Sequence, residues 1–130
     1  MVARELRSRF WREDVRASIR RLMEVCERYG GRFTFFVVGL SAEYNAGTIR
    51  EILGRGHEVA CHGWAHERYD RLAPDDVVRS LERAREMFWR RFRYEVHGFR
   101  APYLAMGPGL PAVLGKLGFA ENAFTSDDVT

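Results

Sequence analysis

The chain has few cysteines, no long apolar run and almost no lysine. Cys26 and Cys61 are its only cysteines, which gives no disulfide framework and favours a reducing compartment with buried thiols. No apolar stretch approaches the roughly 18 residues of a membrane span. The N-terminal segment MVARELRSRFW also lacks the apolar core of a signal peptide. The sequence therefore predicts a cytoplasmic protein with no membrane partner.

Charge is spread along the chain and is not concentrated in one segment. The 21 basic and 18 acidic residues leave a net charge of +3, and all the basic residues except Lys116 are arginines. A nucleic-acid-binding protein is expected to carry a basic stripe with interleaved aromatic residues, so this pattern does not favour a nucleic-acid partner. A length of 130 residues suits one domain but is short for a complete α/β barrel.

Helical and strand patterns alternate along the sequence. The predicted helices span residues 14–29, 48–53, 74–93 and 108–117, and the predicted strands span residues 33–39, 57–61, 97–101 and 119–124. The first strand is an uninterrupted aromatic and β-branched run, typical of a strand buried on both faces. A polar loop is predicted over residues 41–47, with Thr48 as the cap of the next helix. The helix over residues 74–93 is predicted to bury Val78, Leu81, Phe88 and Phe92.

This alternation indicates α/β crossover units and a parallel sheet, whose ligand sites lie at the carboxyl ends of the strands. His62 and His66 follow the second strand in this position, within HEVACHGWAH. Their ring nitrogens can bind zinc, although the spacing also fits histidines that are solvated or hydrogen-bonded in the core. A catalytic zinc site has three protein ligands, and Cys61 is one alternative for the third. His57 and His97 are predicted to be strand residues with ordinary hydrogen bonds.

A second unusual stretch, GFRAPY at residues 98–103, follows the third strand. Arg100 lies at a strand end made rigid by the following Ala-Pro pair, so it can hold a carboxylate or form a surface ion pair. Tyr103 can offer its backbone amide or ring to a substrate, or pack. Trp64, between the histidines, can wall a pocket, stack on a sugar ring or anchor the core.

Three motifs, FTFFVVG, GHEVACHGWAH and GFRAPY, resemble in order and spacing the polysaccharide deacetylase family, also called the NodB-homology family or carbohydrate esterase family four. The resemblance extends from about residue 14 to the end. It implies an α/β fold of the partial, distorted (β/α) barrel type. It also implies hydrolysis of a non-peptide C–N amide bond in an N-acetylated carbohydrate, with a divalent metal, often zinc, held by one Asp and two His.

The resemblance also implies a role for individual positions. His62 and His66 correspond to the metal ligands, with Gly63 where the family usually has Ser or Thr. Arg100 corresponds to the arginine that positions the catalytic carboxylate. Tyr103 corresponds to the residue whose backbone amide stabilises the oxyanion. The predicted substrate contacts are Trp64, Pro102 and Tyr103.

The chain departs from the family pattern at both ends. Residues 1–13 contain no Asp pair, which in the family supplies the general base and the third metal ligand, and the later family motifs are expected beyond residue 130. Residues 1–130 are therefore expected to be one truncated deacetylase domain and a poor catalyst alone. Asp127 and Asp128 are an alternative source of the pair in a permuted domain.

Several functional alternatives remain open from the sequence. The chain is a deacetylase fragment, an enzyme completed by another chain, a degenerate carbohydrate-binding or structural module, or a relative that opens cyclic amides. An incomplete sheet leaves strand edges and apolar faces open, so a homo-oligomer is predicted.

Overall fold

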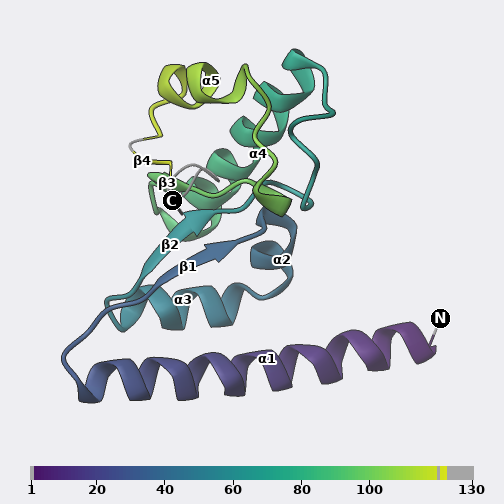
Figure 1. Ribbon diagram of the computed structural model, residues 1–130. Coiled ribbons are helices and arrows are strands. Elements are labelled where there is room, and N and C mark those ends of the chain that lie inside the picture. Colours follow the sequence, from purple (N-terminus) through teal and green to yellow (C-terminus); the bar gives the residue numbers. More distant parts are fainter. Residues whose placement is uncertain (1, 120, 123–130) are drawn as a thin grey trace.

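A computed structural model describes the backbone of residues 2–119 and 121–122 and the side chains of residues 15–119. Its helices and strands alternate along the chain (Figure 1). In order they are α1 (Val2–Arg28), β1 (Thr34–Val37), α2 (Gly39–Tyr44), α3 (Ala46–Gly54), β2 (Glu58–Cys61), α4 (Pro74–Phe92), β3 (Gly98–Phe99), the 3-10 helix η1 (Pro102–Leu104), α5 (Leu110–Lys116) and β4 (Glu121–Asn122).

The four strands form one parallel sheet in the order β1-β2-β3-β4. Val37 of β1 pairs with Cys61 of β2, which in turn pairs with Phe99 of β3, so the carboxyl ends of three strands lie side by side. In Figure 1, α1 and α3 lie below β1 and β2, whereas α4 and α5 lie above them. This arrangement confirms the predicted α/β class with parallel strands.

α4 carries much of the core because it is strongly amphipathic. Leu81 and Phe88 are fully buried, as predicted. Val77 is buried and Val78 is only half-buried, so the prediction for Val78 was wrong by one position. The helix begins at Pro74, a residue suited to the first helical position, and Arg93 ends it in a left-handed conformation with φ 50°.

The predicted polar loop over residues 41–47 is wrong, since α2 occupies most of this segment. Thr48 is not a helix cap either, because α3 begins at Ala46 and Thr48 is buried inside it. The N–H groups of Gly39 and Leu40 donate to the carbonyls of Gly63 and Trp64, both at 2.8 Å. The loop after β2 therefore accepts the hydrogen bonds of the free N–H groups at the start of α2, and no side chain caps this helix.

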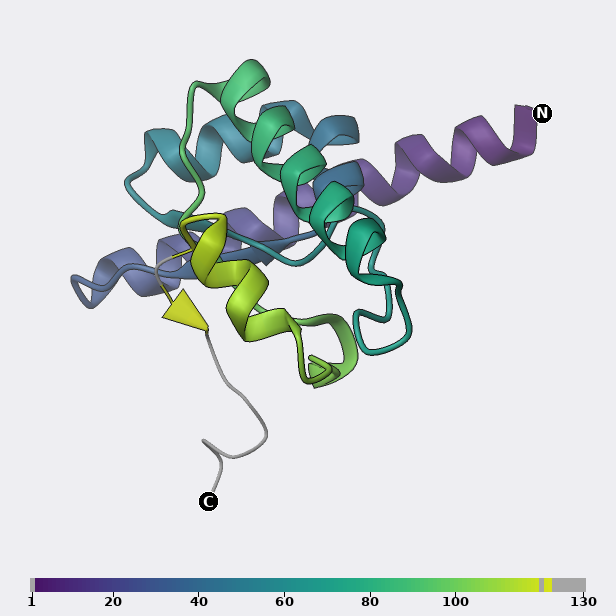
Figure 2. The ribbon, with the colours of Figure 1, turned by 90° about the horizontal axis from the view of Figure 1, so that it is seen from above.

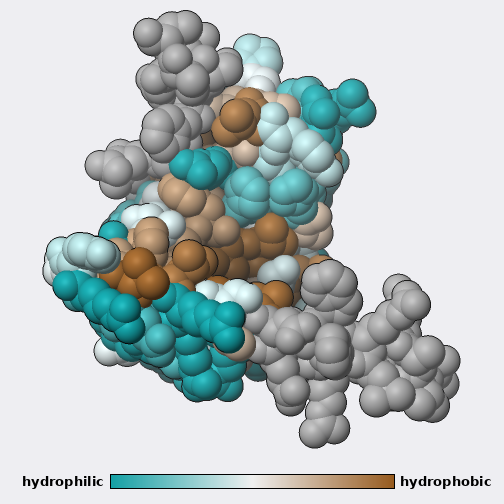
Figure 3. Space-filling view, turned by 60° about the horizontal axis from the view of Figure 1, so that its bottom comes forward, coloured by the Kyte–Doolittle hydropathy of each residue, from teal (hydrophilic) through white to brown (hydrophobic). Residues whose placement is uncertain are grey.

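The prediction that the first strand is buried on both faces is also wrong. β1 is the edge strand of the described sheet, and its residues are half-buried or exposed. On α1, Met23 is fully buried, but Val15 remains 44% exposed. A hollow of about 290 Å³ lies between α1, β1 and α3, and Figure 3 shows apolar surface in this region beside the polar surface of α1.

The elements at the two ends of the described chain are α1 and β4. α1 begins well before the predicted residue 14, and Figure 2 shows its amino-terminal part projecting beyond the other elements. β4 falls within the predicted strand over residues 119–124, of which residues 120, 123 and 124 lie outside the described part. Among the described helices, none has the length and apolar character to span a bilayer. The cytoplasmic location stays a prediction.

Candidate active site

The structure brings together four of the predicted site residues at the carboxyl end of the sheet. His62 directly follows β2, Arg100 directly follows β3, and Tyr103 lies in η1. The ring centroids of His62 and His66 are 5.0 Å apart, and those of His66 and Tyr103 are 4.8 Å apart. Two segments that are distant in the sequence thus form one cluster, because parallel strands end at the same edge of a sheet.

The hydrogen bond of His62 decides which ring nitrogen is available. Its Nδ1 lies 2.7 Å from the carbonyl oxygen of Arg100. A carbonyl oxygen only accepts, so Nδ1 must carry the proton and donate, and the neutral ring then has a lone pair on Nε2. Burial lowers the pKa of His62, and this effect outweighs the hydrogen bond to the Arg100 carbonyl, which raises it. The net lowering favours the neutral imidazole that a metal ligand requires.

His66 reaches His62 through an unusual backbone conformation. Its φ is 61°, in the left-handed region that residues with a β-carbon rarely adopt. The loop that carries it is tied to β1 and α2, because His62 donates its N–H to Val37 and the Gly63 and Trp64 carbonyls accept from α2. The chain therefore turns back after Trp64 and directs the His66 ring toward His62.

Arg100 links two strand ends and extends toward a third. Its backbone N–H donates to the Cys61 carbonyl at 3.0 Å, and its guanidinium carbon lies 4.2 Å from the ring centroid of Phe36 in β1. The side chain thus has a cation–π contact, and its charge lies beside the carboxyl end of the sheet. This is the rigid strand-end position that the sequence predicted.

Tyr103 is an exposed member of the cluster. Its side chain is 64% exposed, and its φ of 60° again lies in the left-handed region. The ring packs edge-on against His66, and the guanidinium carbon of Arg68 lies 5.3 Å from its centroid. Its role in substrate binding stays a prediction.

Two other predicted substrate contacts are buried. Trp64 is 9% exposed, and its ring lies so close to Gly39 that a β-carbon there would be 2.7 Å from it. The guanidinium carbon of Arg83 on α4 lies 4.2 Å from the Trp64 ring centroid. Pro102 is less than 2% exposed. This placement of Trp64 corresponds to the core-anchor alternative, and contact of either ring with a substrate stays a prediction.

A sequence model of the family described as polysaccharide deacetylase matches residues 13–121. The chain belongs to the polysaccharide deacetylase family. The match covers most of the chain and confirms the resemblance inferred from the three motifs.

Relatives of known sequence and structure agree with this assignment. The chain is 31% identical over 103 residues to a chitin deacetylase of Colletotrichum lindemuthianum, covering 75% of this chain and 42% of the relative. A crystal structure of a polysaccharide deacetylase candidate from Mycobacterium smegmatis matches with a TM-score of 0.75 and 32% identity, over 78% of this chain and 35% of that one.

A further structural relative shows the fold alone. A pseudoenzyme of carbohydrate esterase family four from Bacillus anthracis matches with a TM-score of 0.76 at 18% identity, over 80% of this chain and 37% of that one. The chain thus spans less than half the length of these relatives. The fold is a partial (β/α) barrel of the deacetylase type.

The donor set fits two positions of the metal site that the family implies. His62 and His66 lie close together, and His62 has its second nitrogen committed to a carbonyl, as metal-ligating histidines commonly do. Within residues 15–119, no group of three His, Cys, Asp or Glu side chains is arranged to hold a metal ion. Asp127 and Asp128 lie outside the described residues.

Cys61 as a third ligand is wrong. The thiol is fully buried in the core, and desolvation raises its pKa to about 12. In this apolar environment the protonated thiol is favoured. Neighbouring strand residues point to opposite faces, so Cys61 faces the core while His62 faces the site.

Sequence reasoning missed three residues that support the histidine loop, namely Glu67, Tyr69 and Ser80. Ser80 of α4 donates to a carboxylate oxygen of Glu67 and is hydrogen-bonded to Tyr69. The one feature of the sequence that hinted at this arrangement was Gly63, at a position where the family usually has Ser or Thr. No sequence motif indicates that Ser80 of α4 contacts this loop.

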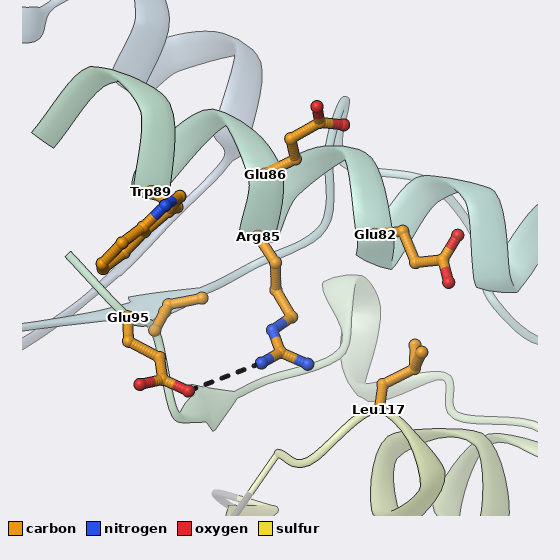
Figure 4. A pocket seen from close by; sticks show the side chains of 7 residues that line it. Glu82, Arg85, Glu86, Trp89, Glu95 and Leu117 are labelled. Atoms are coloured by element: carbon orange, nitrogen blue, oxygen red, sulfur yellow. Dashed lines mark ion pairs between the residues drawn. The ribbon is translucent and has the colours of Figure 1, made fainter. Parts of the chain in front are cut away.

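A separate pocket of about 580 Å³ lies away from this cluster (Figure 4). It is formed by α4, the segment before β3 and the end of α5, and so lies toward the amino end of β3. Figure 4 shows Arg85 extending toward Glu95, with 3.8 Å between the paired nitrogen and oxygen atoms. None of the predicted site residues lines this pocket.

Proposed function

We propose that this chain supplies the histidine part of the active site of a metal-dependent deacetylase, which hydrolyses the amide bond of an N-acetylated carbohydrate. The observation that carries the proposal is the His62–His66 pair at the carboxyl end of β2, with the Nδ1 of His62 committed to the Arg100 carbonyl. The chitin deacetylase relative supports an N-acetylated sugar as substrate.

In this proposal His62, through Nε2, and His66 hold a divalent cation, most simply zinc. When bound, the cation supplies a Lewis acid that polarises the amide carbonyl and activates water. The third ligand is a carboxylate from Asp127, Asp128 or another chain.

The chain's other residues orient groups around the reacting amide. The Arg100 guanidinium holds the catalytic carboxylate in place, and the backbone N–H of Tyr103 donates to the oxygen that gains negative charge. The general base is a carboxylate from outside the described residues, and without it the rate falls by about 10² to 10⁴.

A degenerate module is the second candidate. The observation that favours it is the lack of a third ligand among the described residues. Such a module keeps the carbohydrate site and has lost turnover, so it binds an N-acetylglucosamine oligomer without releasing acetate.

Metal binding and acetate release decide between these functions. We expect the unaltered protein to bind about one zinc ion per chain, and His62→Ala to weaken binding by more than about 100-fold, because a ligand is lost. His97→Ala is the matched control, since His97 is an exposed histidine outside the cluster. Metal content and affinity are measured by calorimetry, and acetate is measured with an N-acetylglucosamine oligomer.

Each proposed function predicts a different combination of zinc binding and product release. Zinc bound equally well by the unaltered protein and by His62→Ala contradicts the proposed site. Weak zinc binding in an Asp127→Asn, Asp128→Asn double variant identifies this pair as the source of the third ligand. Oligosaccharide binding without metal or acetate supports the degenerate module. Ring opening of a cyclic amide, with no acetate released from the oligomer, supports the amidohydrolase alternative.

We also propose that the chain associates with a second copy through the open side of β1 and α1. β1 is the edge of the described sheet, and the hollow beside it is lined by Val15, Ile19, Phe35 and Ile49. Exposed strand edges and apolar hollows are commonly covered in assembled proteins.

A further inference from the structure

The segment Ala65–Glu67 folds tightly around His66. A carboxylate oxygen of Glu67 accepts the backbone N–H of Ala65 at 2.8 Å. The Glu67 side chain therefore connects the residues on either side of His66, whose φ is 61°. This hydrogen bond favours the left-handed conformation that directs the His66 ring toward His62.

The other oxygen of Glu67 is anchored to α4. It accepts the hydroxyl hydrogen of Ser80, and the Tyr69 hydroxyl lies 2.6 Å from the same Ser80 oxygen. A serine hydroxyl has one hydrogen to donate, so Tyr69 is the donor in its contact with Ser80. Tyr69 is 3% exposed and packs edge-on against Phe99 of β3. A chain of hydrogen bonds thus runs from the core, through α4, to the loop that carries His66.

Gly63 fits this arrangement. Its φ is 80°, and a β-carbon there would lie 2.8 Å from Glu67 Oε1 and 3.1 Å from the Tyr69 hydroxyl. The family pattern has a Ser or Thr side chain at this position. In this chain, the Glu67 carboxylate and the Tyr69 hydroxyl occupy the space that such a side chain would need.

We propose that Glu67, anchored by Ser80, is a positioning residue that holds His66 against His62. Glu67 touches neither the reacting atoms nor a metal in this proposal and acts through the backbone around His66. The inference rests on the proposed function only in giving the histidine pair a metal to bind.

The test measures the relative position of the two imidazole rings directly. In the metal-free protein, ring protons of His62 and His66 should show a nuclear Overhauser effect, because the ring centroids are 5.0 Å apart. We expect Glu67→Ala and Ser80→Ala to weaken or abolish this signal. Glu67→Gln should retain it, since the amide oxygen can still accept from Ala65. Glu82→Ala is the control, because Glu82 is an exposed glutamate of α4 that lines the separate pocket.

Metal affinity provides the second readout. With zinc alone as the probe, Glu67→Ala should bind about 10- to 100-fold more weakly, as is typical when a residue that orients a ligand is lost, and Glu67→Gln should restore binding. If Glu67→Ala fails to fold, Ser80→Ala decides. A ring–ring signal unchanged in both alanine variants overturns the proposal. If the unaltered protein binds no zinc, the proposed function fails, and the signal in the metal-free variants still decides the role of Glu67.

Discussion

His57 and His62 show how hydrogen bonds give one residue type two different roles. Nδ1 of His57 accepts the backbone N–H of Phe33 at 2.9 Å, and its Nε2 lies 3.1 Å from a carboxylate oxygen of Glu27. Both ring nitrogens are therefore used, and the side chain is buried. Among the residues whose side chains are described, His62 has a hydrogen-bond partner at Nδ1 and none at Nε2, and the side chain is half-buried, so Nε2 is the nitrogen available to a ligand.

Gly63 provides a prediction at the scale of single residues. Gly63→Ala should lower the free energy of unfolding by about 1–2 kcal/mol for the left-handed backbone alone. The 2.8 Å approach of the new β-carbon to Glu67 Oε1 should add to this loss. In a Glu67→Ala background the second contribution disappears, so the penalty should be smaller. Urea unfolding of the four proteins in this double-mutant cycle measures the difference.

The control for this cycle is Gly54→Ala. A β-carbon on Gly54 at the end of α3 would have no neighbour within 4 Å, so we expect little change or a gain of about 0.5–1 kcal/mol from helix propensity. Strictly additive effects of Gly63→Ala and Glu67→Ala would show that the two positions do not share the space that the structure indicates.

Among the elements, α1 forms several ion pairs with α3 and the segment that follows it. Glu27 of α1 pairs with Arg55 at 2.6 Å and with His57 at 3.1 Å, while Glu51 of α3 accepts from Arg16 and Arg20 of α1. Val15, Leu22 and Val25 of this helix are 44%, 52% and 54% exposed, respectively, whereas Met23 is fully buried. The docking of α1 should therefore depend on pH and on salt.

The pH dependence follows from Glu27. Hydrogen bonding to Arg55, and then to His57, lowers the pKa of Glu27 from 4.5 to about 2. Because this pKa is lowered by folding, the stabilisation is fully present above pH 4.5 and is lost as the pH falls toward 2. The melting temperature of Glu27→Gln should thus lie below that of the unaltered protein at neutral pH, and the difference should shrink between pH 4.5 and 2.

A suitable control makes the same change, from glutamate to glutamine, at a carboxylate that does not contact the buried His57. Glu24→Gln alters a neighbouring exposed carboxylate of the same helix, so it should leave the melting temperature nearly unchanged. A melting difference between Glu27→Gln and the unaltered protein that stays constant down to pH 2 would contradict this role for Glu27.

For the whole molecule, the open edge of β1 predicts association. A second copy covering β1 and the hollow beside α1 must bury more than about 1,000 Å² to form a stable interface. Val15 lines this hollow, so Val15→Asp should place an unpaired charge in the interface and shift the protein to monomers. Sedimentation velocity at micromolar concentration measures the change.

Tyr29→Asp is the control for this prediction. Tyr29 is 87% exposed and lies just beyond the end of α1, outside the lining of the hollow, so this substitution should leave the sedimentation coefficient unchanged. A stable monomer of the unaltered protein at these concentrations would contradict self-association through β1.

The sequence by itself determined the features that depend on local patterns. The period of apolar residues and Pro74 located α4 to within one residue of its observed end. The alternation of strands and helices predicted the parallel sheet. Because parallel strands end at a common edge, the order of the motifs also predicted that His62, Arg100 and Tyr103 meet there.

Only the tertiary structure decided the features that depend on which surfaces come together. The half-buried state of β1 follows from its place at the edge of the described sheet, and its apolar sequence could not show this. Trp64 packs toward α2 and α4 because Gly39 has no side chain in the space that the Trp64 ring occupies. Glu67 accepts a hydrogen bond from Ser80, which lies 13 positions away on α4. Side-chain partners of this kind are set by packing in three dimensions, which no local spacing of residues encodes.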